Sequence, residues 1–257
     1  MGKKIKTFWE NRSQKKLFAG SNDTSVDIFE TNYISTQISK NKKILDVGCG
    51  NGIFLKRLLK IKKYNKAIGI DFSSGMIKAA SKLKLSNTVF KVVDITSKSS
   101  LSKIDDKFDI IVTKRALINI SSNKKQMKIL DYLGNFLKKG GKILCCENSK
   151  NSLNKINKLR IKMNLKKIEK PWHNTYFDDA KIKRYKFKKI KLHKLHEFSS
   201  TFYFLSRIVN ALVTKKENKK FFNRSINEVG MQLDQNLING FSQNILYEFR
   251  RKTSLIN

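Results

Sequence analysis

A glycine-rich segment that directly follows a short apolar run constrains the fold of this 257-residue chain more than any other feature. The run Lys43–Val47 has the composition of a short buried strand and leads into Gly48-Cys-Gly50-Asn-Gly52. Glycines permit a tight turn and let a ligand approach the backbone, and the start of the following helix offers free N–H groups. We therefore expect a ligand-binding loop here, with Asp46 immediately before it.

The spacing of the glycines bears on which ligand the loop binds. A dinucleotide-binding loop has its third glycine three residues after the second. That position is Ile53 in this chain, and the third glycine is Gly52. The loop departs from the NAD pattern, but a Gly-x-Gly pair alone is a weak signal.

Apolar runs alternate with helical patterns after the glycine loop. Four further runs have the length and composition of buried strands: 67–70, 88–93, 108–112 and 142–146. Strands of this kind, separated by helices, predict a parallel sheet covered on both faces, in a doubly wound α/β fold. Ligands bind such sheets beyond the carboxyl ends of the strands, where Asp71 and Asp94 follow the second and third runs.

The complete prediction is a mostly parallel sheet of seven strands, with an α-rich insertion after the fifth strand and an antiparallel last strand. Residues 1–40 are expected to form an N-terminal helical cap, with a helix over 26–38. Its apolar anchors are Phe8, Trp9, Leu17 and Phe18. Residues 41–148 form the core, and residues 149–257 supply the insertion and the final strands of the same sheet.

The net charge of +35 has two readings that the sequence leaves open. A charge of this size supports binding to nucleic acid or to an anionic membrane surface. Only nine of the 55 basic residues are arginine, however, and the lysines are scattered along the chain with much Asn and Ile. Because all three residues have A/T-rich codons, compositional drift is the other explanation.

The chain carries no pattern that predicts secretion, a membrane span or a metal site. Residues 1–14 lack the apolar core of a signal peptide, and no run approaches the roughly 18 apolar residues of a spanning helix. Cys49, Cys145 and Cys146 form no C-x-x-C pair. We expect a cytoplasmic protein with reduced thiols and no metal.

Five segments in sequence order resemble the motifs of the class I, Rossmann-like methyltransferases that use S-adenosylmethionine. They are Ile44-Leu-Asp-Val-Gly-Cys-Gly-Asn-Gly52, Gly69-Ile-Asp-Phe-Ser73, Val93-Asp-Ile95, Phe108-Asp-Ile-Ile111 and Leu137-Lys-Lys-Gly-Gly141. The resemblance covers residues 43–146 and is specific for the cofactor, but not for the methyl acceptor.

The resemblance implies a cofactor site at the strand ends. Asp46 would pair with the amino group of the methionine end, Asp71 would accept the ribose hydroxyls, and Asp94 would accept the adenine amino group. The full set of residues expected at the cofactor is Asp46, Gly48, Cys49, Gly50, Asn51, Gly52, Asp71, Phe72, Met76, Asp94, Ile95 and Arg115. The alternative for Asp71 is a helix N-cap, for which Ser73 and Ser74 compete.

The same resemblance places substrate recognition in the insertion after the fifth strand. His173, in Pro171-Trp-His-Asn-Thr-Tyr176, is the candidate general base for a hydroxyl acceptor; a structural hydrogen bond is the alternative. His193 and His196 are expected on an exposed strand. The residues expected to contact the acceptor are Trp9, Asn119, Trp172, Asn174 and Tyr176.

Two classes of methyltransferase fit the sequence poorly. The Asn/Asp-Pro-Pro-aromatic tetrad of many amino-methylating enzymes is absent from the segment 113–119, and Cys145 and Cys146 are expected to be buried strand residues rather than nucleophiles. The sequence favours an O-methyltransferase of sugar, polysaccharide or secondary-metabolite biosynthesis, acting on a small molecule. An RNA methyltransferase, suggested by the charge, is the alternative, and a non-catalytic cofactor-binding protein is a third hypothesis.

Overall fold

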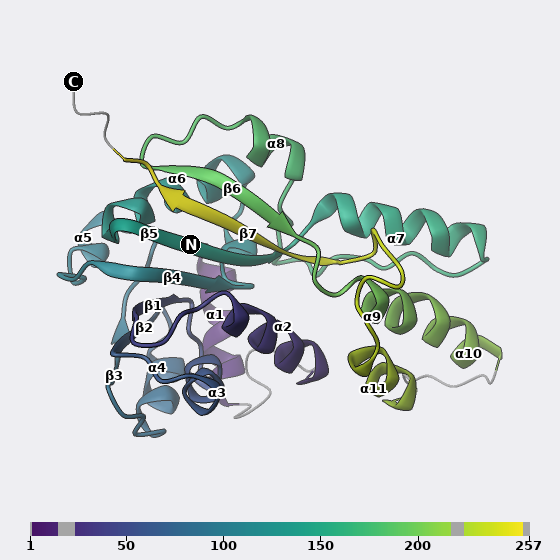
Figure 1. The fold of residues 1–257 in the computed structure, drawn as a ribbon, viewed down its shortest axis with the longest axis horizontal. Helices are drawn as coiled ribbons and strands as arrows, with labels where there is room; N and C mark the ends of the chain where they lie inside the picture. Colours follow the sequence, from purple (N-terminus) through teal and green to yellow (C-terminus); the bar gives the residue numbers. More distant parts are fainter. Residues whose placement is uncertain (1, 15–23, 217–223, 254–257) are drawn as a thin grey trace.

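The computed structural model, which describes residues 2–14, 24–216 and 224–253, contains a seven-stranded sheet in the order β3-β2-β1-β4-β5-β7-β6 (Figure 1). Strands β1 to β5 pair in parallel, and β7 is antiparallel to both of its neighbours. The strands are β1 Lys43–Val47, β2 Lys66–Asp71, β3 Thr88–Val92, β4 Phe108–Lys114, β5 Leu137–Asn148, β6 Ile190–His196 and β7 Asn244–Arg251. The predicted mostly parallel α/β sheet with an antiparallel last strand is confirmed.

Helices cover both faces of this sheet (Figure 1). They are α1 Lys3–Arg12, α2 Thr24–Thr36, α3 Ile53–Ile61, α4 Ser74–Ser81, α5 Lys98–Leu101, α6 Asn123–Leu133, α7 Lys150–Lys162, α8 Asp179–Arg184, α9 Ser200–Phe204, α10 Asn210–Lys216 and α11 Arg224–Gln232. A π-helical turn, η4 (Leu205–Val209), joins α9 to α10. Beyond the carboxyl ends of the parallel strands lie α7, α9, α10 and α11 (Figure 1).

The core has two halves because side chains alternate between the two faces of each strand. In β1, Leu45 packs with α6 residues such as Leu130, whereas Ile44 packs with α2 and α3 residues such as Ile34 and Leu55. All five side chains are buried. This double burial explains why the strands read as nearly continuous apolar runs.

The fifth strand differs from its sequence-based prediction. The sequence predicts this strand over 142–146, but β5 already begins at Leu137. The pairing of β4 with β5 shifts register between Phe108 and Ile110, and Gly140 has φ +74°. The pairing with β4 passes from Leu137 directly to Lys142, so residues 138–141, both glycines included, bulge out of the strand ladder.

The prediction that His196 is exposed was wrong. Its imidazole is buried between α2 and β7, with Nδ1 3.1 Å from the Tyr33 hydroxyl and Nε2 3.2 Å from a Glu248 oxygen. His193, at the shift in register between Leu192 and Lys194, is exposed as expected. Simple alternation along this lysine-rich edge strand therefore does not predict the burial of His196.

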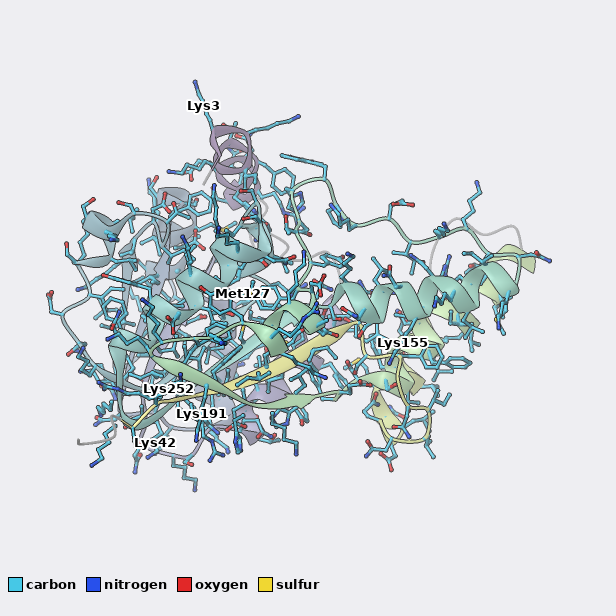
Figure 2. The ribbon with its side chains drawn as sticks, turned by 90° about the horizontal axis from the view of Figure 1, so that it is seen from above. Lys3, Lys42, Met127, Lys155, Lys191 and Lys252 are labelled. Carbon is cyan, nitrogen blue, oxygen red and sulfur yellow. The ribbon has the colours of Figure 1, made fainter. Side chains whose placement is uncertain are left out.

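The basic charge is spread over the surface. Lys3 on α1, Lys155 on α7 and Lys191 on β6 are all exposed and lie on well-separated parts of the molecule (Figure 2). Within the described ranges, no helix has both the length and the apolar character needed to cross a bilayer. The proposed anchors Leu17 and Phe18 lie outside the described residues.

Replacing Leu45, which has no exposed surface, by Ala should lower the free energy of unfolding by about 2–5 kcal/mol, because a cavity is left in the packed core. Urea unfolding followed by circular dichroism measures the change. Val89→Ala is the control, since Val89 lies on edge strand β3 and is 47% exposed; its effect should stay below about 1 kcal/mol. Equal losses in the two variants would contradict the assigned core.

Candidate functional site

A cleft lies at the carboxyl ends of β1, β2 and β4, next to the glycine loop; we call it the strand-end cleft. Its empty volume is about 920 Å³, the part open to solvent included. It is lined by Trp9, Asp27, Asp46, Gly48, Cys49, Gly50, Asn51, Ile53, Phe54, Ile70, Asp71, Phe72, Met76, Val93, Asp94, Ile95, Lys114, Arg115, Ala116 and Asn119. Every residue expected at the cofactor lines this cleft except Gly52.

The glycine loop is shaped by left-handed backbone positions. Gly48 has φ +73°, and a Cβ there would lie 2.4 Å from the Cβ of Ala116. Gly52 precedes α3 with φ +76°, and a Cβ there would lie 2.9 Å from the ring of Phe90. A Cβ at Gly50, in contrast, would meet nothing within 4 Å. Gly52 is therefore needed for packing, and Gly50 leaves open space at the cleft.

Two aspartates face the strand-end cleft, of which Asp46 is buried and Asp71 is half-buried. Asp46 is 2% exposed, and within the described part of the chain its Oδ2 atom has no hydrogen-bond partner. Burial raises the pKa of Asp46 to about 7, against the opposing effect of Lys114. Asp71 accepts hydrogen bonds from the backbone N–H groups of Gly50 (3.0 Å) and Ser73 (2.9 Å), and burial raises its pKa to about 6.

The N-cap alternative for Asp71 does not hold. The side chain of Ser73 caps α4 by accepting a hydrogen bond from Met76 N at 3.1 Å. Asp71 instead ties the glycine loop to the end of β2 and presents its carboxylate at the cleft.

Helix α1 lies across this cleft through polar contacts that the sequence did not signal. Lys6 Nζ lies 2.7 Å from Asp94 Oδ2, and Glu10 Oε1 accepts a hydrogen bond from Gly75 N at 2.9 Å. Trp9 Nε1 donates to Asn119 Oδ1 at 3.1 Å. These contacts fasten α1 to three separate segments of the core.

The carboxylate of Asp94 makes more contacts within the protein than its expected role in binding adenine requires. Its Oδ1 accepts hydrogen bonds from Thr96 N (2.9 Å) and Thr96 Oγ1 (2.6 Å), and its Oδ2 pairs with Lys6. Burial alone would raise the pKa of Asp94, but the contacts with Lys6 and Thr96 lower it to about 2. Asp94 is therefore ionised at neutral pH.

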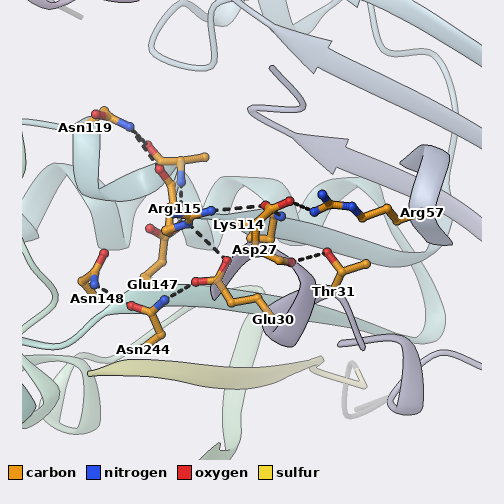
Figure 3. A network of polar contacts seen from close by, with 11 residues as sticks. Asp27, Glu30, Thr31, Arg57, Lys114, Arg115, Asn119, Glu147, Asn148 and Asn244 are labelled. Carbon is orange, nitrogen blue, oxygen red and sulfur yellow. Dashed lines mark hydrogen bonds and ion pairs between the residues drawn. The ribbon is translucent and has the colours of Figure 1, made fainter. Parts of the chain in front are cut away.

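A charged network joins α2 to the end of β4 (Figure 3). Arg57, Lys114 and Arg115 all pair with Asp27, and Arg115 Nε also lies 3.2 Å from Glu30 Oε2. Burial lowers the pKa of Lys114 to about 8. Asp27 and Glu30 were missed, although two acids three residues apart on an otherwise uncharged helix were a usable signal.

Glu147 fixes the turn that follows β4. Its Oε1 accepts hydrogen bonds from Thr113 Oγ1 (2.9 Å), Ala116 N (3.1 Å) and Leu117 N (3.0 Å), and its Oε2 accepts from Ile118 N (3.2 Å). The side chain is completely buried, which raises its pKa to about 7. This turn carries Arg115, which has φ +53°.

A second cavity, which we call the arginine cavity, adjoins the strand-end cleft and shares Trp9 and Arg115 with it. Its empty volume is about 880 Å³, again with the part open to solvent. It is lined by Phe8, Trp9, Arg12, Val26, Arg115, Ile118, Asn148, Pro171, His173, Asn174, Tyr176, Tyr203, Arg207, Gln243 and Asn244. The expected acceptor residues Trp9, Asn174 and Tyr176 are among them.

Two other expected acceptor residues lie elsewhere. Asn119 lines the strand-end cleft and accepts a hydrogen bond from Asn174 Nδ2 at 3.1 Å. Trp172 lines neither cavity; it is 55% exposed and packs edge-on against Phe8 on α1.

His173 lies at the wall of the arginine cavity, with its ring centroid 4.4 Å from that of Phe8. Its Nδ1 atom is buried and has no hydrogen-bond partner among the described residues. Burial lowers the pKa of His173, and the positive charge of Arg12 lowers it further. The imidazole is therefore neutral at neutral pH.

The cysteines have no reactive setting. All three are buried, and burial raises the pKa of the Cys145 and Cys146 thiols well above the usual value. A search of the described ranges shows no group of three or more His, Cys, Asp or Glu side chains placed to hold a metal ion.

Residues 38–223 match the family model described as a methyltransferase domain. The chain is also similar to protein 235L of Invertebrate iridescent virus 6, which carries a methyltransferase name, with 36% identity over 107 residues. That match covers 42% of this chain and 37% of the viral protein. The chain thus aligns with only about a third of the length of the curated relatives it matches.

Two solved structures have a similar fold over nearly the whole chain. The N-methyltransferase NodS of Bradyrhizobium japonicum, in complex with S-adenosylhomocysteine, has a TM-score of 0.59 and 12% identity, with 97% of this chain and 99% of NodS covered. A chain from the complex of the Haloferax volcanii Trm112 methyltransferase activator with a methyltransferase has a TM-score of 0.62 and 13% identity, with 98% and 100% covered. The chain belongs to the methyltransferase-domain family and has the Rossmann-like fold of the class I enzymes that depend on S-adenosylmethionine.

Proposed function

We propose that this protein transfers a methyl group from S-adenosylmethionine, bound in the strand-end cleft, to a hydroxyl group of a small molecule in the arginine cavity. The observation that carries the proposal is the junction of the two cavities at Trp9 and Arg115. One cavity holds the carboxylates at the strand ends, and the other holds His173.

The strand-end cleft suits a cationic cofactor with ribose hydroxyls. The buried Asp46 Oδ2 lacks a partner in the described structure and could pair with the ammonium of the methionine end. Each carboxylate oxygen of Asp71 accepts one backbone hydrogen bond, which leaves capacity on both for hydroxyl donors. When bound, S-adenosylmethionine supplies an electrophilic methyl group.

The adenine end fits less simply. Asp94 Oδ1 already accepts two hydrogen bonds from Thr96, so an adenine amino group would have to share Oδ2 with Lys6. Met76 and Ile95 are apolar residues of the same part of the cleft wall and could pack against the base. We propose that α1 and the adenine contact Asp94 together.

His173 is the proposed base because its environment keeps the imidazole neutral. Burial and the charge of Arg12 both disfavour the imidazolium, so a nitrogen is available to accept the hydroxyl proton. The missing partner at Nδ1 among the described residues favours this role over a structural hydrogen bond at that nitrogen. An amine acceptor, such as an N-methyltransferase takes, needs no base when it binds unprotonated.

A small molecule is the proposed acceptor rather than RNA. The arginine cavity has the size of a small-molecule site. Exposed lysines such as Lys3, Lys155 and Lys191 lie on well-separated parts of the molecule (Figure 2). We assign most of the +35 charge to composition.

Asp71→Ala should weaken the binding of S-adenosylhomocysteine at least tenfold, about 1.4 kcal/mol, because two ribose hydroxyls lose their acceptor. Isothermal titration calorimetry measures the affinity, and Asp71→Asn tests the charge with little change in shape. Asp105→Ala, at an exposed carboxylate, is the control and should bind as the wild type does. Equal affinity in all four proteins would contradict the cofactor site.

His173→Gln should slow methylation of a hydroxyl acceptor by about 10²–10⁴-fold, with unchanged affinity for S-adenosylhomocysteine. In the wild type, kcat should fall as the pH drops through the pKa of His173, because protonation removes the base. That fall should lie below about pH 6.5, the ordinary value, since burial and Arg12 lower the pKa. Release of S-adenosylhomocysteine gives the rate, and undiminished turnover in His173→Gln would remove the assigned role.

A further inference from the structure

We propose that the acceptor carries an anionic group, a carboxylate or a phosphate, which Arg12, Arg115 and Arg207 bind in the arginine cavity. This inference rests on the proposed function, because it takes the arginine cavity as the acceptor site. It adds the chemical class of the substrate, which neither the fold nor the family specifies.

The choice of basic residue in the cavity is the first line of support. Only nine of the 55 basic residues in the chain are arginine, yet among the described residues that line this cavity there are three arginines and no lysine. Compositional drift toward lysine explains the many lysines on the surface, but it cannot explain why arginine predominates at this cavity. Arginine presents a planar fork of N–H donors that matches the oxygens of a carboxylate or a phosphate.

The three arginines converge from distant parts of the chain. Arg12 ends α1, Arg115 follows β4, and Arg207 lies in η4. Folding alone brings these segments together at one cavity.

Aromatic rings and carboxylates position the guanidinium groups. Arg12 lies over the rings of Phe8 and Trp9, at 5.9 and 5.8 Å from their centroids, and Arg207 lies 5.4 Å from the centroid of Tyr203. Stacking on an aromatic face restricts the orientation of a guanidinium group. Arg115 is oriented by its ion pairs with Asp27 and Glu30.

The charges of the two cavities are opposite in character. Four aspartates, with Lys114 and Arg115, line the strand-end cleft, whereas the described residues that line the arginine cavity include no Asp or Glu. The first lining suits a cationic cofactor, and the second suits an anionic partner. An anionic acceptor would also be drawn toward the sulfonium side of the cavity junction.

Gln243 adds a second feature of the ligand. It is 6% exposed and lines the arginine cavity, and its Oε1 has no hydrogen-bond partner in the described part of the chain. A buried carbonyl oxygen of this kind calls for a donor. The acceptor should therefore present a hydroxyl or amino group in addition to its anionic group.

The test is isothermal titration of the full chain, saturated with S-adenosylhomocysteine, with matched aromatic probes. Phenyl phosphate and benzoate carry the anion; phenol and benzamide are their neutral counterparts. At least one anionic probe should bind tenfold or more tightly than its neutral counterpart. Preference for phenyl phosphate over benzoate would assign a phosphate, and the reverse preference would assign a carboxylate.

Three variants link the binding to the cavity. Arg207→Gln and Arg12→Gln should each weaken binding of the preferred anion at least tenfold, and Arg207→Lys should restore part of the loss. Arg184→Gln removes the same charge from exposed helix α8 and should leave the affinity unchanged. Two separate sites on the cavity keep the test valid if one variant fails to fold.

Several results would overturn the inference. Equal binding of the anionic and neutral probes would overturn it. An equal loss of affinity in Arg184→Gln and in the cavity variants would also overturn it, because the anion would then be attracted by net charge alone. Arg207-dependent binding of a short RNA in preference to all four probes would replace the small molecule with a nucleic acid. Failure to bind S-adenosylhomocysteine contradicts the proposed function instead, and the anion titrations can then be repeated without it.

Discussion

Both cavities depend on the hydrogen bonds that the buried carboxylate of Glu147 accepts from the turn after β4. It accepts hydrogen bonds from three successive backbone N–H groups, of residues 116–118, and from the Thr113 hydroxyl. A carboxylate buried without such donors would be strongly unfavourable, so the turn and the charge stabilise each other. The turn after β4 places Ala116 against Gly48. It also places Arg115 at the boundary between the two cavities.

Charge separation across that boundary is the main electrostatic feature of the site. Carboxylates gather at the strand-end cleft, and arginines gather in the neighbouring cavity. Arg115 belongs to both, and its pairing with Asp27 and Glu30 links the cavities to α2 (Figure 3). Because these groups are partly or wholly buried, salt screens them less than it screens the surface lysines.

Local sequence patterns predicted the sheet and the glycine loop because strand periodicity and turn geometry are local properties. The residues of the motif 44–52, with Asp71 and Asp94, reach one cleft because the carboxyl ends of neighbouring parallel strands share an edge. The sequence could not show that Lys114 pairs with Asp27, 87 residues away, or that Lys6 engages Asp94. The burial of His196 likewise depends on Tyr33 and Glu248, which are remote in the chain. The domain boundaries and the cytoplasmic location stay predictions.

A crystal structure of the protein in complex with S-adenosylhomocysteine would test both cavities at once. We expect the ligand in the strand-end cleft, with its ammonium beside Asp46, its ribose hydroxyls on Asp71 and its sulfur facing the junction at Trp9 and Arg115. Ligand density in the arginine cavity, or a bound ligand that leaves Asp46 and Asp71 without contact, would contradict the assignment of the two cavities.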